Sequence, residues 1–117
     1  MKRVAIPVVK GRLSEFFGRC SHYEIFDTDG IKILKNDFMV PPPMSVKALP
    51  EWAAKQGITD VISYKVDRNI IELFSVHKIN LFVGIPQSTP LRLMKDFLDG
   101  NLNSDGKIIT QIIENDR

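Results

Sequence analysis

The chain has 117 residues, of which 44% are hydrophobic and 26% charged, with a net charge of +2, one cysteine and two histidines. This length suits one compact domain, and a single cysteine excludes an internal disulfide or a cysteine-rich metal cage within one chain. The nearly balanced charge gives no indication of binding to nucleic acid or to a membrane surface. No apolar run approaches the roughly 20 residues of a membrane span or has the form of a secretory signal, so we expect a cytoplasmic protein.

The first half of the sequence predicts a strand, a loop and a hairpin. Residues 4–9 form an apolar, largely β-branched run that is typical of a strand buried on both faces. Residues 10–21 contain two glycines and make a long loop. Two alternating runs, 23–27 and 31–38, flank an Asp-Gly turn, which is a strong hairpin signal. The triple proline at 41–43 is an extended linker.

The second half alternates helices with strands. The predicted elements are a helix from Ser45 as N-cap to Gln56, a strand over 59–64, a helix capped by Asp67, a strand over 79–85, and a helix that Thr89 and Pro90 open and Gly100 ends. The order β-ββ-α-β-α-β-α predicts an α/β fold, with a mixed five-stranded sheet and helices on both faces. Strands 4–9, 59–64 and 79–85 are expected to be parallel and central, with the hairpin toward one edge.

The chain shows no internal repeat, and residues 1–102 are expected to form one domain. Residues 103–117 are then a C-terminal extension. Its isoleucine-rich run over 108–113 has the pattern of an edge strand, or of a tail that orders only in some contexts.

Ligands of open α/β sheets bind outside the carboxyl ends of the parallel strands. Three loops leave those ends here, over 10–21, 64–68 and 85–89. Helix N-termini near two of them present positive dipole ends to the same edge. These loops also carry four cations, namely Arg12, Arg19, Lys65 and Arg68. We expect an edge that attracts anions, the alternative being that the charges only solvate the surface.

The loop over 11–23 carries the most informative residues. Phe16 and Phe17 are adjacent in it, so that they either plug the core beneath the loop or wall a pocket. Gly18 permits a turn or a close approach. Cys20 and His22 are a candidate pair of soft metal ligands, with Cys20 favoured as a thiolate if the neighbouring arginine lowers its pKa. Alternatively, Cys20 is a small buried apolar residue and His22 only begins a strand.

The run Ser14-Glu15-Phe16-Phe17-Gly18-Arg19 resembles the Ser-Glu-His-Phe-Gly-Arg signature of the dinitrogenase iron–molybdenum cofactor biosynthesis family, which comprises NifX-like domains and the C-terminal part of many NifB proteins. Further matches are Val-Ala-Ile-Pro-Val at 4–8, Leu-Pro-Glu-Trp at 49–52, Gly-Ile-Thr-Asp-Val-Ile at 57–62 and Val-Gly-Ile-Pro at 83–86. Each motif alone is weak. Together, in order and at matching spacings, they cover about residues 2 to 102.

The resemblance implies a ribonuclease-H-like three-layer fold and a small non-enzymatic carrier of iron–sulfur or iron–molybdenum cluster species. The partners would be a protein that donates or accepts the cluster, or a second copy of the chain, since a homodimer doubles the single cysteine. The cofactor-binding residues would be Arg12, Ser14, Phe16, Phe17, Gly18, Arg19 and Lys65, with Cys20 and His22 as metal ligands.

The sequence also departs from the family pattern in three places. Phe16 replaces the family histidine, Pro-Pro-Pro-Met at 41–44 replaces a stretch with histidine and glycine, and Ser63–Asp67 replaces a glycine-rich turn. Two hypotheses follow. The chain is a cluster carrier with its pocket formed by 12–22, 64–67 and 85–89, or it is a diverged interaction or regulatory domain that no longer binds metal.

An enzyme is not expected. Two-metal phosphoryl chemistry needs carboxylates that converge at the carboxyl ends of strands, and the run 4–9 holds none. Asp27 and Asp29 sit at the hairpin turn and Asp60 begins its strand, so all three belong at the end away from the expected pocket. The sequence also lacks Walker and Gly-x-Gly-x-x-Gly patterns.

Overall fold

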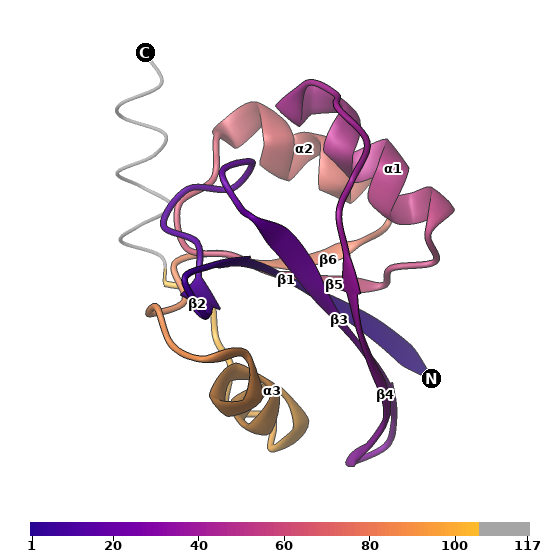
Figure 1. Ribbon diagram of the computed structural model, residues 1–117, viewed down its shortest axis with the longest axis vertical. Coiled ribbons are helices and arrows are strands. Elements are labelled where there is room, and N and C mark those ends of the chain that lie inside the picture. The colour runs from indigo at the N-terminus through magenta and orange to yellow at the C-terminus, as the bar shows by residue number, and fades with distance from the viewer. Residues whose placement is uncertain (106–117) are drawn as a thin grey trace.

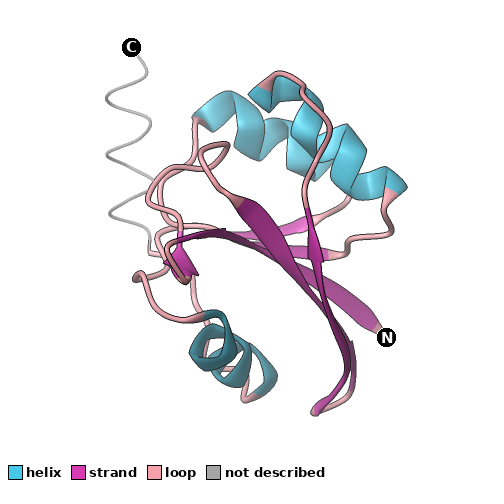
Figure 2. Cartoon of the chain, in the orientation of Figure 1, coloured by secondary structure: helices cyan, strands magenta, loops and turns pink. Residues whose placement is uncertain are grey.

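The chain folds into three layers in the computed structural model, which describes residues 1–105. Figures 1 and 2 show α1 and α2 on one face of a sheet and α3 on the other. The strands are β1 (Lys2–Val9), β2 (Arg12–Leu13), β3 (His22–Asp29), β4 (Lys32–Met39), β5 (Asp60–Ile62) and β6 (Asn80–Phe82). The helices are the 3-10 turn η1 (Val46–Ala48), α1 (Leu49–Lys55), α2 (Arg68–Val76) and α3 (Pro90–Leu98). The edge strand expected over 108–113 lies outside the described residues.

The strand order is β4-β3-β1-β5-β6, with β2 paired to β1 off this path. β1, β5 and β6 are parallel neighbours, whereas β3 runs antiparallel to both β1 and β4. The mixed sheet, the parallel strands and the hairpin at one edge are thus confirmed. The expectation that all three parallel strands are central is wrong, because β6 ends the sheet within the described residues and its Asn80 is exposed.

The sheet has six strands and not the five expected. The additional strand is β2, which folds back on β1 through Lys10 and Gly11. Both turn residues have positive φ, 52° and 77°, as a tight two-residue hairpin turn requires. Lysine rarely adopts such a φ, and a two-residue strand has no readable alternation. The sequence therefore indicated only a loop here.

Alternation along β1 divides the core between the two faces of the sheet. Val4, Ile6 and Val8 pack with residues of α3, while Ala5 packs with residues of α1 and α2. Because successive side chains of a strand point to opposite faces, one apolar strand fills both cores. This is the doubly buried strand that the sequence predicts.

The first helix begins later than expected. Ser45 makes no capping hydrogen bond, and the α-helix starts at Leu49 after the 3-10 turn. Pro50 is the reason, because proline lacks the N–H that a helix interior needs and is tolerated in a first turn. The other helix ends agree in position with the sequence, although Thr89 makes no capping hydrogen bond. Asp67 caps α2 by accepting a hydrogen bond from the Asn69 amide at 3.1 Å, and Gly57, with φ +77°, follows α1.

No helix within residues 1–105 is both long enough and apolar enough to cross a bilayer.

Candidate functional site

The three loops that follow β1, β5 and β6 are joined by backbone hydrogen bonds. The amide of Phe17 donates to the Lys65 carbonyl at 2.8 Å, and the Lys65 amide donates to the Glu15 carbonyl at 3.1 Å. The Gly84 amide in turn donates to the Tyr64 carbonyl at 2.8 Å. Residues 14–17 therefore run beside residues 63–66 as an additional strand would, with an isolated parallel bridge between Phe16 and Lys65. The loops meet at one edge of the sheet, as expected.

A small aromatic and cationic surface lies on this edge. The Phe16 ring is 42% exposed. The Arg19 guanidinium carbon lies 5.3 Å from the centre of this ring, and the Lys65 Nζ lies 5.2 Å from it. Lys65 Nζ is also 5.5 Å from the centre of the Tyr64 ring. We call Phe16, Arg19, Tyr64 and Lys65 the Phe16 cluster.

The charge of the Phe16 cluster is only partly compensated. Lys65 Nζ lies 3.2 Å from a carboxylate oxygen of Glu15, and both side chains remain partly exposed. Cations over an aromatic face are attracted by the ring quadrupole, which holds the Arg19 and Lys65 head groups beside the same ring. The result is an apolar ring flanked by two cations, one of which already has an acidic neighbour.

The turn that carries the cluster is fixed from beneath by Ser14, which is 3% exposed. Its hydroxyl lies 2.9 Å from the Phe16 carbonyl oxygen and also contacts the Arg19 carbonyl. A hydroxyl donates one proton at a time, so the two carbonyls share it. The Arg19 amide closes the same turn by donating to the Phe16 carbonyl at 3.1 Å. Ser14 therefore shapes the site without facing a ligand.

Gly18 lets this turn approach η1 closely. Its φ is +95°, and a Cβ placed on it would lie 2.7 Å from Cγ2 of Val46. Any side chain would therefore be strained by the backbone and would clash with Val46. The turn and the close approach expected of this glycine are both present, and the group approached is the 3-10 turn.

The two adjacent phenylalanines have opposite roles. Phe17 is 8% exposed and its ring lies 5.3 Å from that of Phe74 in an edge-to-face arrangement. It plugs the core on the α1 and α2 side, while Phe16 lies on the surface. The alternative of a core plug therefore holds for Phe17, whereas Phe16 lies on an exposed surface.

Cys20 and His22 do not come together as a ligand pair. Cys20 is half-buried against the cluster that contains Phe17 and Tyr23. The His22 ring lies 4.8 Å from the Phe38 ring, on the opposite face, because neighbouring residues of a strand alternate and Tyr23 faces α1. Within residues 1–105 no group of three or more His, Cys, Asp or Glu side chains is placed to hold a metal ion.

Burial raises the pKa of the Cys20 thiol, and a weaker interaction with Tyr23 acts in the opposite direction. The condition for a thiolate, a pKa lowered by the neighbouring arginine, is therefore not met, because desolvation disfavours the charged form. Tyr23 is a feature that the sequence did not indicate. Its hydroxyl is buried beside Cys20 with no hydrogen-bond partner among the described residues, and burial strongly raises its pKa.

The remaining expected site residues lie around this surface. Arg12 is exposed in β2. The α2 N-terminus beside Lys65 is already capped by the Asp67 carboxylate. Asp27 and Asp60 lie at the other end of the sheet, as expected, and both have partners there. Asp27 pairs with Arg3 at 2.7 Å, and Asp60, 1% exposed, accepts from Asn80 Nδ2 at 3.1 Å.

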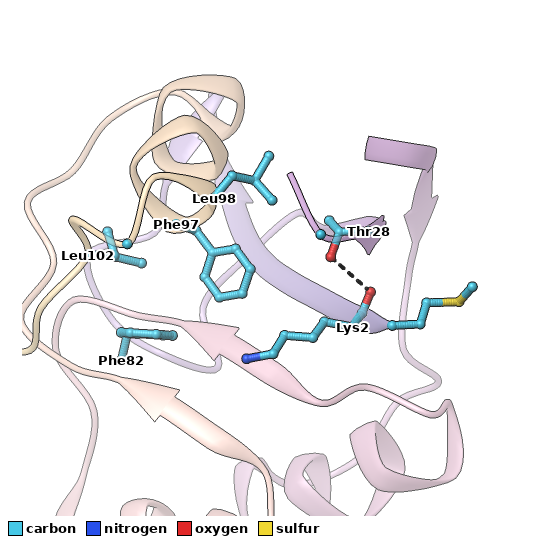
Figure 3. A pocket seen from close by; sticks show the side chains of 9 residues that line it. Lys2, Thr28, Phe82, Phe97, Leu98 and Leu102 are labelled. Atoms are coloured by element: carbon cyan, nitrogen blue, oxygen red, sulfur yellow. Dashed lines mark hydrogen bonds between the residues drawn. The ribbon is translucent and has the colours of Figure 1, made fainter. Parts of the chain in front are cut away.

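A cavity of about 370 Å³ also lies at that other end, between the start of β1 and α3. Figure 3 shows Lys2 extending toward the rings of Phe82 and Phe97. Lys2 Nζ lies 5.6 Å from the Phe97 ring centre and 3.8 Å from Asp60 Oδ2. Its ammonium group is thus already engaged. Sequence patterns did not reveal this cavity, because its walls come from four separate segments of the chain.

Comparison with known proteins places the chain in a family. The family model described as dinitrogenase iron–molybdenum cofactor matches residues 1–100, and no curated protein matches the sequence. Among solved structures, PH0822 is 26% identical with a TM-score of 0.80, over 88% of this chain and 94% of that one. A dinitrogenase-like protein of Methanocaldococcus jannaschii is 18% identical with a TM-score of 0.71, over 88% and 93% of the two chains.

The apo form of the orange protein from Desulfovibrio gigas is similar in fold at 16% identity, with a TM-score of 0.73 over 90% of this chain and 93% of that one. At this identity the likeness shows the fold alone. The family match spans the sheet, the helices and the loops that carry the Phe16 cluster. The chain therefore belongs to the dinitrogenase iron–molybdenum cofactor family.

Proposed function

We propose that this protein is a small binding protein that carries an anionic metal–sulfur cluster at the Phe16 cluster and passes it to an acceptor protein in the cytoplasm. The single observation that carries the proposal is the pair of cations, Arg19 and Lys65, set 5.3 Å and 5.2 Å from the centre of one exposed aromatic ring. Family membership supports a role linked to the iron–molybdenum cofactor. The strand order, with β3 antiparallel to β1, is what we expect of a ribonuclease-H-like fold.

The residues present fit an anion better than a metal ion. Direct coordination would need several converging ligands, and the described residues offer no such group. A preassembled cluster brings its own sulfides to its metals, so the protein needs only to neutralise charge and exclude water. Arg19 supplies a planar fork of donors, and Lys65 a compact charge. Cys20 and His22 then have no required part in binding.

Binding would change the partner of Lys65. Its ammonium now lies 3.2 Å from Glu15, and an exposed ion pair of this kind contributes only about 0–1 kcal/mol. An anion of higher charge can therefore displace the Glu15 carboxylate. Because the cations are exposed, binding should weaken as salt concentration rises. We propose binding and transfer, with no catalytic step.

Phe16 favours the second candidate function, an interaction domain that binds no metal. This residue stands where the family signature has histidine, and it leaves an apolar ring 42% exposed at the site. A partner protein could cover that ring. In the first function the two cations bind a metal–sulfur cluster, and in the second the site contacts a partner protein without metal. A measurement of bound metal therefore separates the two.

The experiment is anaerobic incubation of the full chain with iron, sulfide and molybdate, followed by desalting, visible spectroscopy and metal analysis. The test variant is Arg19→Gln with Lys65→Gln. Its matched control is Arg92→Gln with Lys95→Gln on α3, which removes the same two charges from exposed positions. We expect metal on the wild type and the control, and at least about tenfold weaker retention by the test variant.

Cys20→Ala should retain metal as the wild type does. Wild-type protein that holds no metal would overturn the carrier proposal and leave the interaction domain. Equal retention by the test variant and its control would show that the Phe16 cluster is not the site.

A further inference from the structure

β4 forms an exposed edge of the sheet in the described part of the chain. It pairs with β3 on one side, and its residues are exposed from Lys32 to Phe38. Apolar side chains are prominent among them, since Leu34 is 54% and Phe38 70% exposed. An edge strand presents unpaired N–H and C=O groups that can pair with another strand. β4 is eight residues long, so its free edge is long enough to pair with a strand of another chain.

We propose that β4 pairs antiparallel with β4 of a second copy of this chain, about a two-fold axis at Asn36. The argument rests on register and charge. Residues directly opposite in an antiparallel ladder point to the same face, and a two-fold axis perpendicular to the sheet keeps every residue on its own face. The axis must therefore pass through a residue and not between two residues.

The charges of β4 select among these axes. An axis at Lys35 would set two lysines opposite each other, and an axis at Asp37 would set two aspartates opposite each other. An axis at Asn36 sets Lys35 opposite the partner's Asp37 and repeats that pair by symmetry. Opposite charges across strands stabilise pairing and like charges oppose it.

Lys35 and Asp37 already lie on one face of β4, with Nζ 3.1 Å from Oδ2 and both side chains more than half exposed. Dimerisation would join this pair to its symmetry copy, so that four charges of alternating sign lie two on each strand. The same register brings Phe38 near the partner's Leu34, at the end of the regular ladder, where the two exposed apolar side chains would approach each other.

The length of the regular edge limits the strength of this contact. The β3–β4 ladder is continuous over Lys35–Met39 and shifts register between Asp27 and Thr28, which leaves Leu34 as the extra residue of a bulge. Bulges shorten and twist an edge. We therefore expect a weak, closed dimer and not an open-ended assembly.

The test is sedimentation equilibrium of the full chain over a range of concentrations. We expect a monomer–dimer equilibrium that Lys35→Asp and Asp37→Lys each weaken by about tenfold, because each variant sets like charges opposite each other. An equimolar mixture of the two variants should dimerise again, since one chain then carries two acidic and the other two basic residues. Lys95→Asp on α3 makes the same charge change away from β4 and should dimerise as the wild type does.

Phe38→Ser is a second variant, and its side chain is exposed enough that the monomer should remain folded, as circular dichroism would verify. It should weaken the dimer without changing the charges. A wild type that stays monomeric up to about millimolar concentration overturns the proposal. Single variants that dimerise as the wild type does, or a mixture that fails to associate, overturn it as well, as do assemblies larger than a dimer.

Discussion

The two ends of the sheet use their charged residues in opposite ways. At the end where β1 and β5 begin, Arg3 is bound to Asp27 at 2.7 Å and to the Gln56 carbonyl at 2.6 Å, and Asp60 is buried among its partners. At the end where the loops meet, Arg19 and Lys65 lie over an exposed ring. Charges that hold the fold together have their partners within the chain. Charges that could serve a ligand are held in place but left accessible.

This contrast predicts which residues matter for each property. The stability of the fold should depend on the buried residues beneath the loops and on the charged pairs where β1 and β5 begin. Ligand binding should depend on the exposed Phe16 cluster. The following experiments test that division, from the largest expected effect to the smallest.

Phe17→Ala should lower the free energy of unfolding by about 3–5 kcal/mol, because it removes a buried ring and leaves a cavity beside Phe74. Phe16→Ala is the matched control, and it should cost less than about 1 kcal/mol because its ring is exposed. Urea denaturation of both variants measures the difference. Equal losses would contradict the division between a buried anchor and a surface residue.

Asp60→Ala should cost about 2–3 kcal/mol, since it removes a buried carboxylate together with the charge-assisted hydrogen bonds from its partners. Those partners are the Thr59 hydroxyl at 2.6 Å and Asn80 Nδ2 at 3.1 Å. Asp29→Ala is the control. Asp29 is an exposed residue at the same end of the sheet, where β3 ends, and its substitution should change stability by less than about 0.5 kcal/mol. Metal retention should be unchanged by either substitution. A folded Asp60→Ala variant that loses metal would show that binding at the Phe16 cluster depends on the opposite end of the sheet, and would contradict the division.

Gly18→Ala should destabilise the protein by about 2 kcal/mol, because it combines a positive φ with a clash against Val46. Gly11→Ala is matched in backbone, with φ +77° but no atom within 4 Å of the added Cβ, and should cost about 1 kcal/mol. Adding Val46→Ala should recover part of the loss in Gly18→Ala only. Thermal unfolding of the wild type, Gly18→Ala, Val46→Ala and the variant with both changes forms a double-mutant cycle, and the absence of coupling would exclude the clash.

The smallest effect is expected for Cys20. It should appear in the pH dependence of thiol alkylation and of the stability of the protein. Burial raises the pKa of its thiol, so alkylation by iodoacetamide should require higher pH in the folded protein than in guanidinium. The stability gained by burying the neutral thiol is present below the ordinary thiol pKa and is lost as pH rises toward the folded value. Cys20→Ala should lack this decline, and a folded thiol that reacts like the unfolded one would contradict the assignment.

Much of the fold could be predicted because it depends on local signals. The Asp-Gly turn indicated the β3–β4 hairpin, and Asp67 and Gly57 marked helix ends. The meeting of three loops at one edge followed from the parallel order of the strands. Even the late start of α1 is explained by a single local residue, Pro50, whose missing N–H excludes it from a helix interior.

The sequence by itself determined the order of the elements apart from β2 and η1, the doubly buried β1 and the loop that carries the site, since these depend on residues a few positions apart. Only the tertiary structure decided which phenylalanine is buried, because Phe17 meets Phe74 and Phe16 meets Lys65 across about fifty residues or more of chain. The tertiary structure also decided that Cys20 and His22 lie on different sides of the sheet. The pairing of β3 with β1 sets which residues of β3 face α1 and which face away. A pattern states which residues can face a core, and packing between distant segments selects the ones that do.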